Sequence, residues 1–371
     1  MMLTSFSVTN FRGFNETVTF RLDQASDYQF QSDLVAGSHV RKAIVYGANA
    51  SGKSSLCNAL ADIVTMLTDN YASPNLVSRT NYGSSLNPAE MPCSFAYELE
   101  EEGERIRYEY SRSKQSLIEE KLFSDGRLVA GFNGNEPFVD YDHFPELSKQ
   151  ALASYNKTIS FIKYLSRSGF SFKKKTVANL MKFADGLLLF RSVIDGNEFA
   201  GFVPTSMTLT KVLVDTNGLE DFHAFLRECG IDYQLEIVPT ADPNSPELRV
   251  VFPHESRNFF DVASTGTRYL LLFFTWVRLL SNKASLLIID EFDAYYHDDV
   301  AISVFSVLRK LDYPVIVTTH RTCLMANSIA RPDCVFLLQN NAIKPLAQLT
   351  DRELREANNI EKLYRNGAFT E

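Results

Sequence analysis

The sequence predicts an α/β protein with a mixed central sheet, an N-terminal antiparallel β-subdomain and an inserted, mainly helical lobe. Three observations support this prediction. Short alternating runs up to about residue 125 indicate strands and hairpins, the following stretch mixes helical patterns with irregular polar segments, and apolar strands alternate with helices after residue 248. We therefore divide the chain into residues 1–125, an inserted lobe at 126–245, and residues 246–371.

The N-terminal part supplies most of the predicted strands. Residues 2–22 alternate as two strands around a turn, and residues 42–47 have the composition of a short buried strand. A helix is expected from residue 53 to about residue 67. Further alternating runs surround an acidic turn at residues 100–104, which is typical of a solvated hairpin tip.

The C-terminal part has a regular order of elements. After a strand near residue 248 we expect a helix at 265–280, a strand at 285–290, a helix from about 298 to 311, a strand at 314–320 and another helix. Strands separated by helices of this length imply a parallel sheet covered on both faces.

Composition limits the protein class. With 371 residues, 45% of them hydrophobic, the chain can bury a large core. The net charge of -8 excludes a surface that is basic throughout, so nucleic acid could be bound only by a local patch. The five cysteines have no metal-type spacing, and no apolar run is long enough to span a membrane. We expect a cytoplasmic protein without membrane contact.

A phosphate-loop pattern follows the strand at residues 42–47. The stretch "GANASGKSS" has two glycines separated by four residues and followed by Lys and Ser, between a strand and a helix. Backbone N–H groups and the helix N-terminus would converge there on the phosphates of ATP. Lys53 would neutralise the β- and γ-phosphates, and the Ser54 hydroxyl would coordinate Mg²⁺. The predicted nucleotide-binding residues are Gly47, Ala48, Asn49, Ala50, Ser51, Gly52, Lys53, Ser54 and Ser55.

Two carboxylates and a histidine end the next two predicted core strands. "LLIIDEFD" would bring Asp290 and Glu291 to the carboxyl edge of a parallel sheet, where such sheets hold their ligands. Asp290 suits a magnesium ligand, and Glu291 suits a catalytic group that polarises the attacking water. "VIVTTH" ends at His320, which could act as a polar sensor of the γ-phosphate. A strand end followed by a helix cap is the alternative interpretation of Asp290 and Glu291.

The turn "ASTGTRYL" enters the predicted helix at 265–280, and Ser264 or Thr265 could simply cap it. Together with the phosphate loop, the Asp-Glu pair and the histidine, however, it resembles the signature turn of the ATP-binding-cassette (ABC) ATPases. This resemblance implies an ABC-type P-loop NTPase fold and a head-to-tail dimer, or a higher oligomer, that encloses ATP. Ser264 and Gly266 of one copy would then face the nucleotide of the other. Asp293 matches a position that family members use across the dimer interface, and His297 lies in the same loop.

The branch of the family is indicated by other motifs. "VTNFRGF" resembles the N-terminal signature of RecF, structural-maintenance-of-chromosomes and OLD-type ATPases. "IIDEFDAYYH", "VTTH" and "NNIEKLYRNGAF" resemble compact AAA-type ATPases of abortive-infection and phage-defence loci. The resemblance covers residues 1–125 and 245–371. It implies a switch ATPase in bacterial anti-phage defence that controls a nuclease or toxin effector. A nucleotide-gated scaffold with little turnover and a RecF-like DNA-repair ATPase are the alternatives.

The sequence also departs from this family. We identify no glutamine in a loop that senses magnesium. The chain stops about fifty residues after His320, where OLD-type nucleases carry a Toprim domain. We therefore expect no nuclease in this chain and a Toprim-type partner acting in trans.

A basic segment in the inserted lobe is a candidate surface for DNA, RNA or a protein partner. Aromatic residues alternate there with cations, which could provide phosphate contacts and base stacking. Aromatic side chains that face a core, with lysines left in solvent, are the alternative interpretation. The candidate patch comprises Lys163, Arg167, Lys173, Lys174 and Lys175.

Overall fold

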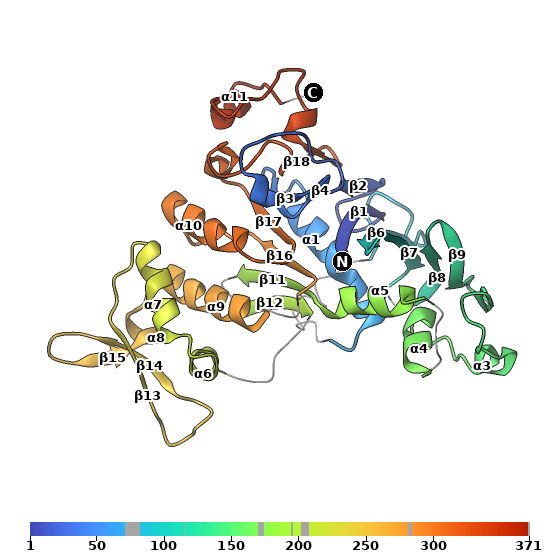
Figure 1. The fold of residues 1–371 in the computed structure, drawn as a ribbon, viewed down its shortest axis with the longest axis horizontal. Helices are drawn as coiled ribbons and strands as arrows, with labels where there is room; N and C mark the ends of the chain where they lie inside the picture. The colour runs from blue at the N-terminus through green and yellow to red at the C-terminus, as the bar shows by residue number, and fades with distance from the viewer. Residues whose placement is uncertain are drawn as a thin grey trace. The chain divides into compact units, whose positions relative to one another are not determined.

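The computed structural model describes residues 1–70, 82–114, 116–169, 174–193, 196–201, 208–280 and 284–369. The chain forms two compact units (Figure 1). The first unit comprises Met1–Phe202, Ser285–Glu291 and Tyr313–Glu371, and the second comprises Val203–Ala284 and Phe292–Asp312.

An antiparallel sheet forms one layer of the first unit. Its strand order is β10-β9-β8-β7-β6-β1-β2, and every pairing in it is antiparallel. Period-2 alternation along β6 and β7 places the apolar side chains on the inner face and the polar ones outside. The strands are β1 (Met2–Thr9), β2 (Val18–Arg21), β6 (Cys93–Glu101), β7 (Glu104–Arg112), β8 (Leu117–Ser124), β9 (Arg127–Phe132) and β10 (Pro137–Val139).

A mixed sheet forms the core of the same unit, in the order β12-β11-β16-β17-β5-β18-β19. Its five inner strands are parallel, and the two edge strands are antiparallel. The carboxyl ends of the parallel strands therefore meet at one edge of the sheet. The strands are β5 (Lys42–Tyr46), β11 (Leu187–Val193), β12 (Gly196–Gly201), β16 (Leu286–Asp290), β17 (Val315–Thr319), β18 (Val335–Gln339) and β19 (Ala342–Pro345).

Helix α1 (Lys53–Leu67) lies between the two sheets (Figure 1). It contacts β11 and β16 of the core sheet. On the other side, the Tyr97 hydroxyl of β6 donates to the Ala59 carbonyl oxygen at 2.8 Å, and the Tyr110 hydroxyl of β7 donates to Asp62 Oδ2 at 2.8 Å. Eleven of its fifteen residues are buried because both sides of the helix are covered.

Shorter elements complete the first unit. Helix α4 packs on α5 and β9, while α5 also packs on α1. The helices are α3 (Lys149–Ala153), α4 (Phe161–Arg167), α5 (Thr176–Asp185) and α11 (Ile360–Arg365), with 3₁₀ turns at Ser32–Leu34, Thr322–Met325 and Leu346–Gln348 and a two-stranded ribbon of β3 (Val35–Ala36) and β4 (His39–Val40).

The second unit is a group of helices with a small antiparallel sheet, β13-β14-β15. Aromatic rings form its core: Phe274 lies with its ring centroid 5.2 Å from that of Phe222 and 5.6 Å from that of Phe225. The elements are α6 (Leu209–Asp215), α7 (Leu219–Glu228), β13 (Leu235–Val238), β14 (Glu247–Val251), β15 (Ser256–Asn258), α8 (Phe259–Val262), α9 (Thr265–Leu280) and α10 (Asp298–Arg309).

The predicted domain boundaries differ from these units. The boundary between residues 125 and 126 falls in the turn of the β8–β9 hairpin, so residues on both sides belong to one sheet. Residues 126–245 are not a separate lobe, because β9 and β10 extend the antiparallel sheet and β11 and β12 join the core sheet. The strand expected near residue 248 is β14, which pairs in the small sheet instead of the core.

Candidate active site

The predicted phosphate loop joins β5 to α1, as its sequence requires. All five residues of β5 are buried, so the strand fixes the start of the loop. Gly52 ends it with φ +104°, and Ala50 also has a positive φ of +62°. A Cβ on Gly47 would lie 3.0 Å from the Leu338 carbonyl oxygen and against the Ser51 hydroxyl. The two glycines are therefore needed for the tight curvature of this loop.

Lys53 turns back into the loop that precedes it. Its Nζ donates to the carbonyl oxygens of Gly47 at 2.7 Å and Ala48 at 2.9 Å, and its side chain is buried. Ala48, Asn49 and Ala50 are exposed at the mouth of the loop. The Ser51 hydroxyl is buried and has no hydrogen-bond partner among the described residues.

This arrangement fits a triphosphate. It combines a glycine cradle, an inward-pointing ammonium and the N-terminus of a fifteen-residue helix, each of which attracts an anion. Ser54 and Ser55 follow Lys53 in the first turn of α1 and are half-buried.

Asp290 and Glu291 lie at the end of β16, separated from the phosphate-loop strand only by β17. The Thr318 hydroxyl of β17 donates to Asp290 Oδ1 at 2.6 Å and accepts the backbone N–H of Glu291 at 2.8 Å. Asp290 is almost fully buried, whereas the Glu291 side chain is one-third exposed. Glu291 has a φ of +52°, a conformation that is uncommon outside glycine and that turns the chain sharply after the strand.

Arg191 is a site residue that the sequence groups with the cations of the basic segment, and the structure places it at the two acids instead. It lies at the end of β11 and pairs in register with Asp290. Its Nε is 3.2 Å from Asp290 Oδ2, and one of its terminal nitrogens is 3.4 Å from Glu291 Oε2. The available signal was the apolar run "LLLF" ended by a charged residue, the same pattern that identified the strand before Asp290.

The buried Cys57 thiol of α1 links the phosphate loop to the carboxylates. Burial raises the pKa of this thiol well above its usual value, and neighbouring Asp290 raises it further, whereas Arg191 and Lys53 lower it. The geometry itself is given by the sheet: Lys53 follows β5 and Asp290 ends β16, and both strands end at the same edge with only β17 between them.

His320 directly follows β17 and is exposed. The strand order therefore places the phosphate loop, His320 and the Asp-Glu pair at the ends of the consecutive strands β5, β17 and β16. This order, with a separate antiparallel sheet over α1, decides the fold. The chain has the fold of an ABC-type P-loop NTPase.

The predicted signature turn lies in the second unit. Ser264 caps α9: its hydroxyl accepts the Thr267 N–H at 3.2 Å, as expected for a helix N-cap. A Cβ on Gly266 would lie 2.8 Å from the Tyr295 carbonyl oxygen. The rings of Tyr269 and Tyr295 stack with their centroids 4.1 Å apart. The turn is therefore packed against the loop that contains Asp293.

Asp293 and His297 occupy that loop with different exposure. Asp293 is fully buried, whereas His297 is exposed at the start of α10 and makes no side-chain cap hydrogen bond. The role of Asp293 at a dimer interface stays a prediction.

The predicted basic patch is only partly a surface. Lys163 is buried, which corrects its assignment as a surface cation: its Nζ donates to the Thr68 carbonyl oxygen at 2.5 Å and lies 2.9 Å from Asp69 Oδ1. Burial lowers the pKa of Lys163. Arg167 also pairs with Asp69, and Lys174 lies 2.9 Å from Asp125 Oδ2.

The rest of the patch stays a prediction. Lys175 is exposed, and Lys173 lies outside the described residues. Phe161, one of the aromatic residues that could have stacked on bases, is fully buried.

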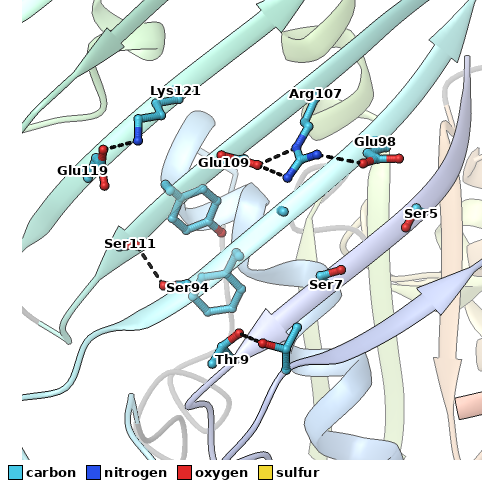
Figure 2. A pocket seen from close by; sticks show the side chains of 14 residues that line it. Ser5, Ser7, Thr9, Ser94, Glu98, Arg107, Glu109, Ser111, Glu119 and Lys121 are labelled. Carbon is cyan, nitrogen blue, oxygen red and sulfur yellow. Dashed lines mark hydrogen bonds and ion pairs between the residues drawn. The ribbon is translucent and has the colours of Figure 1, made fainter. Parts of the chain in front are cut away.

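A separate hollow of about 370 Å³ lies on the outer face of the antiparallel sheet (Figure 2). Two pairs of its hydroxyls contact each other, Ser94 with Ser111 at 2.8 Å and Thr9 with Thr17 at 2.7 Å. The labelled charged side chains are also paired: Arg107 contacts both Glu98 and Glu109, and Lys121 contacts Glu119. These pairs account for the charges of the hollow, and we assign it no ligand.

Comparisons with known proteins give a partial family match. The family model described as "AAA domain, putative AbiEii toxin, Type IV TA system" matches residues 42–132, which include the phosphate loop. The chain matches no curated protein sequence.

Several solved structures are similar at low identity. The SMC head domain from Thermotoga maritima shares 16% identity, with 93% of this chain and 99% of that chain covered and a TM-score of 0.47. An SmcHead bound to the C-winged helix domain of ScpA shares 14%, with 93% and 96% covered and a TM-score of 0.46. An Smc head domain with an extended coiled coil, bound to the C-terminal domain of ScpA derived from Pyrococcus furiosus, shares 12%, with 92% and 95% covered and a TM-score of 0.49.

None of the helices in the described part of the chain is long and apolar enough to cross a membrane.

Proposed function

We propose that the protein is an ATP-binding and ATP-hydrolysing switch whose two copies enclose nucleotide. The observation that carries this proposal is the strand order, which places the phosphate loop with Lys53 and the Asp290–Glu291 pair at the edge where β5, β17 and β16 end. A phosphate-binding lysine and a pair of carboxylates on neighbouring parallel strands are the groups that phosphoryl transfer needs.

Each residue has a distinct task in this proposal. Lys53 exchanges the Gly47 and Ala48 carbonyl oxygens for phosphate oxygens, while the loop backbone binds the remaining phosphate charge. Ser54 and Asp290 would hold Mg²⁺, which would offset the negative charge of the phosphates. Glu291 orients the attacking water and accepts its proton, and His320 contacts the γ-phosphate.

The site becomes complete only in a pair of copies. Ser264 and Gly266 would present the N-terminus of the sixteen-residue helix α9 to the γ-phosphate held by the other copy, and Asp293 would contact the interface. Hydrolysis then removes the ligand that joins the two copies, so the nucleotide sets the lifetime of the assembly.

We further propose a role in bacterial defence against phage, with a nuclease or toxin effector such as a Toprim-type nuclease supplied in trans. The motifs quoted above and the description of the matching family model support this role. An ATPase that closes on DNA is equally compatible with the fold. Strong stimulation of hydrolysis by duplex DNA, with a steep salt dependence, would favour that alternative.

Two substitutions test the ATPase. Lys53→Ala should weaken binding of a fluorescent ATP analogue by at least about tenfold, because the buried ammonium contacts the phosphates. Glu291→Gln should retain nucleotide binding but lower the hydrolysis rate by about a hundredfold or more, since it removes a positioned general base. Equilibrium fluorescence titration and phosphate release are the measurements.

Lys149→Ala, which changes an exposed lysine of α3, is the matched control and should behave as the parent. The ATPase assignment fails if Lys53→Ala binds nucleotide as well as Lys149→Ala does. Parental hydrolysis by Glu291→Gln would exclude the proposed role of Glu291.

A further inference from the structure

We propose that Arg191 is an internal counter-ion that occupies Asp290 in the nucleotide-free protein, and that it must leave Asp290 when magnesium and nucleotide bind. Arg191 is in this view a positioning residue that makes metal binding an exchange of one cation for another. The proposal rests on the proposed function, because it assumes that Asp290 takes part in binding Mg²⁺.

The strand register makes the contact an intrinsic part of the fold. Strands β11 and β16 are parallel neighbours, and Arg191 lies directly opposite Asp290. From this position its guanidinium reaches both acids, with Nε 3.2 Å from Asp290 Oδ2 and a terminal nitrogen 3.4 Å from Glu291 Oε2. A planar guanidinium with several N–H donors suits such a double contact, whereas an ammonium does not.

The Asp290 carboxylate has little capacity left for a second cation. It is buried, with 2% of its side chain exposed, and Oδ1 already accepts the Thr318 hydroxyl at 2.6 Å. Mg²⁺ binds oxygen ligands at about 2.0–2.1 Å in near-octahedral geometry, so it needs direct access to a carboxylate oxygen. Arg191 covers the second oxygen, and two cations on one buried carboxylate repel each other.

Glu291 offers the displaced arginine a second partner. Its side chain is 34% exposed, compared with 2% for Asp290 and 23% for Arg191. Release from Asp290 therefore leaves the guanidinium within reach of an acid that is open to solvent. Arg191 can exchange partners without leaving the site.

The test compares nucleotide affinity with and without magnesium. Binding of a fluorescent ADP analogue, which is not hydrolysed, is titrated in excess Mg²⁺ and in EDTA. Arg191→Gln should increase the ratio of the two affinities by about tenfold, since the variant no longer has to vacate Asp290 before the metal binds. Arg191→Lys should show a smaller increase because one ammonium cannot contact both acids.

The control is Arg127→Gln, which removes an exposed arginine that pairs with Asp140 and Asp142 on the antiparallel sheet. The ratio of its nucleotide affinities in Mg²⁺ and in EDTA should equal that of the parent. Thermal unfolding of all variants checks that they are folded. A further readout needs no variant: a structure of the parent with magnesium and ADP should show Asp290 without its Arg191 contact.

The outcomes separate this inference from the proposed function. If Arg191→Gln still binds nucleotide but its ratio of affinities in Mg²⁺ and in EDTA is unchanged or smaller, the proposed cation exchange is wrong and the proposed ATPase is unaffected. A magnesium-bound structure that keeps Arg191 on Asp290 overturns it as well. If the parent binds no nucleotide under either condition, the exchange and the proposed ATPase are both wrong.

Discussion

At the scale of single residues, Thr318 determines how the two acids are held. Its hydroxyl has one proton, which it donates to Asp290 Oδ1, and it accepts the backbone N–H of Glu291. Both hydrogen bonds lie where β16 ends and the chain turns with Glu291 at positive φ. Thr318 thus couples the orientation of the buried acid to the backbone of the exposed one.

Thr318→Val tests this coupling with a change of nearly the same shape. Without the hydroxyl, Asp290 Oδ1 and the Glu291 N–H lose their partner, and leaving buried polar groups unpaired costs about 1–3 kcal/mol each. We expect kcat for ATP hydrolysis to fall by about tenfold, together with a lower Tm.

Thr275→Val is the control, because that buried hydroxyl donates only to the Leu272 carbonyl oxygen inside α9. It should lower Tm without a comparable loss of kcat. Equal effects of the two variants on kcat would show that Thr318 has no special role at the acids.

The residues of the candidate site were predictable to the extent that they belong to local motifs. Lys53 and Asp290 could be predicted because their motifs consist of consecutive residues. Lys53 belongs to a glycine loop before a helix, and Asp290 belongs to a pair of acids after an apolar strand. An apolar run also precedes Arg191, but neither Arg191 nor Thr318 belongs to a motif that indicates its partner. Their roles come from the pairing of β11 with β16 and of β16 with β17, which links positions about 100 and 28 residues apart in sequence.

At the scale of elements, helices with strong start signals were predicted best. Helix α1 spans Lys53–Leu67 and α9 spans Thr265–Leu280, in agreement with the expected ranges. A phosphate loop starts the first, and the Ser264 cap starts the second. The helix expected after His320 is instead a 3₁₀ turn at Thr322–Met325, so the chain reaches β18 without a full helix.

Strand pairing was predicted less well than strand existence. Strand β11 was assigned to a helical lobe because its apolar run is short and its neighbours are helical. A short apolar run is compatible with either a buried strand or a buried helix, and only the partner strand decides between them. Strand β14 was expected in the core sheet because it begins the regular order of strands and helices after residue 248, but it pairs with β13 and β15.

Glu120 of β8 is the acid that joins the antiparallel sheet to helix α4. It is fully buried, and its carboxylate accepts the Tyr108 hydroxyl at 2.6 Å and the Phe161 N–H at 2.7 Å. Burial raises its pKa above the ordinary value of 4.5, although these donors and the Ser160 hydroxyl oppose the shift.

This raised pKa predicts a pH dependence of stability. The folded protein keeps the Glu120 proton to higher pH than the unfolded chain does. The contribution of Glu120 to stability is therefore fully present below pH 4.5 and is lost as the pH rises through the pKa of the folded state. We expect the Tm of the parent minus that of Glu120→Gln to fall as pH is raised from 4.5 toward 8.

Thermal unfolding at several pH values is the measurement. Glu119→Gln serves as the control for removing a carboxylate from the same strand, because the Glu119 side chain is 41% exposed and pairs with Lys121. If the Tm of the parent minus that of Glu120→Gln rises with pH, the stated direction is wrong.

At the scale of the whole molecule, the residues proposed to act together belong to different compact units. Lys53, Asp290, Glu291 and His320 lie in the first unit, and Ser264, Gly266 and Asp293 lie in the second. The proposed dimer joins the first unit of one copy to the signature turn of the other. Neither copy alone would then contain a complete catalytic site.

Mixing two defective variants tests this claim directly. Lys53→Ala removes the phosphate-binding lysine of its own chain. Ser264→Ala removes the serine that would face the nucleotide held by the other copy. Each variant alone should hydrolyse ATP very slowly. In a mixed pair, the intact loop of the Ser264→Ala chain meets the intact turn of the Lys53→Ala chain.

The decisive measurement is phosphate release by an equimolar mixture of Lys53→Ala and Ser264→Ala. The comparison is a mixture of Lys53→Ala and Glu291→Gln, because these two defects inactivate both sites of a mixed pair. The first mixture should recover up to roughly a quarter of the parental rate, because half of randomly formed pairs carry one intact site, and the second should recover none. If neither mixture exceeds the sum of its separate variants, the composite site is contradicted.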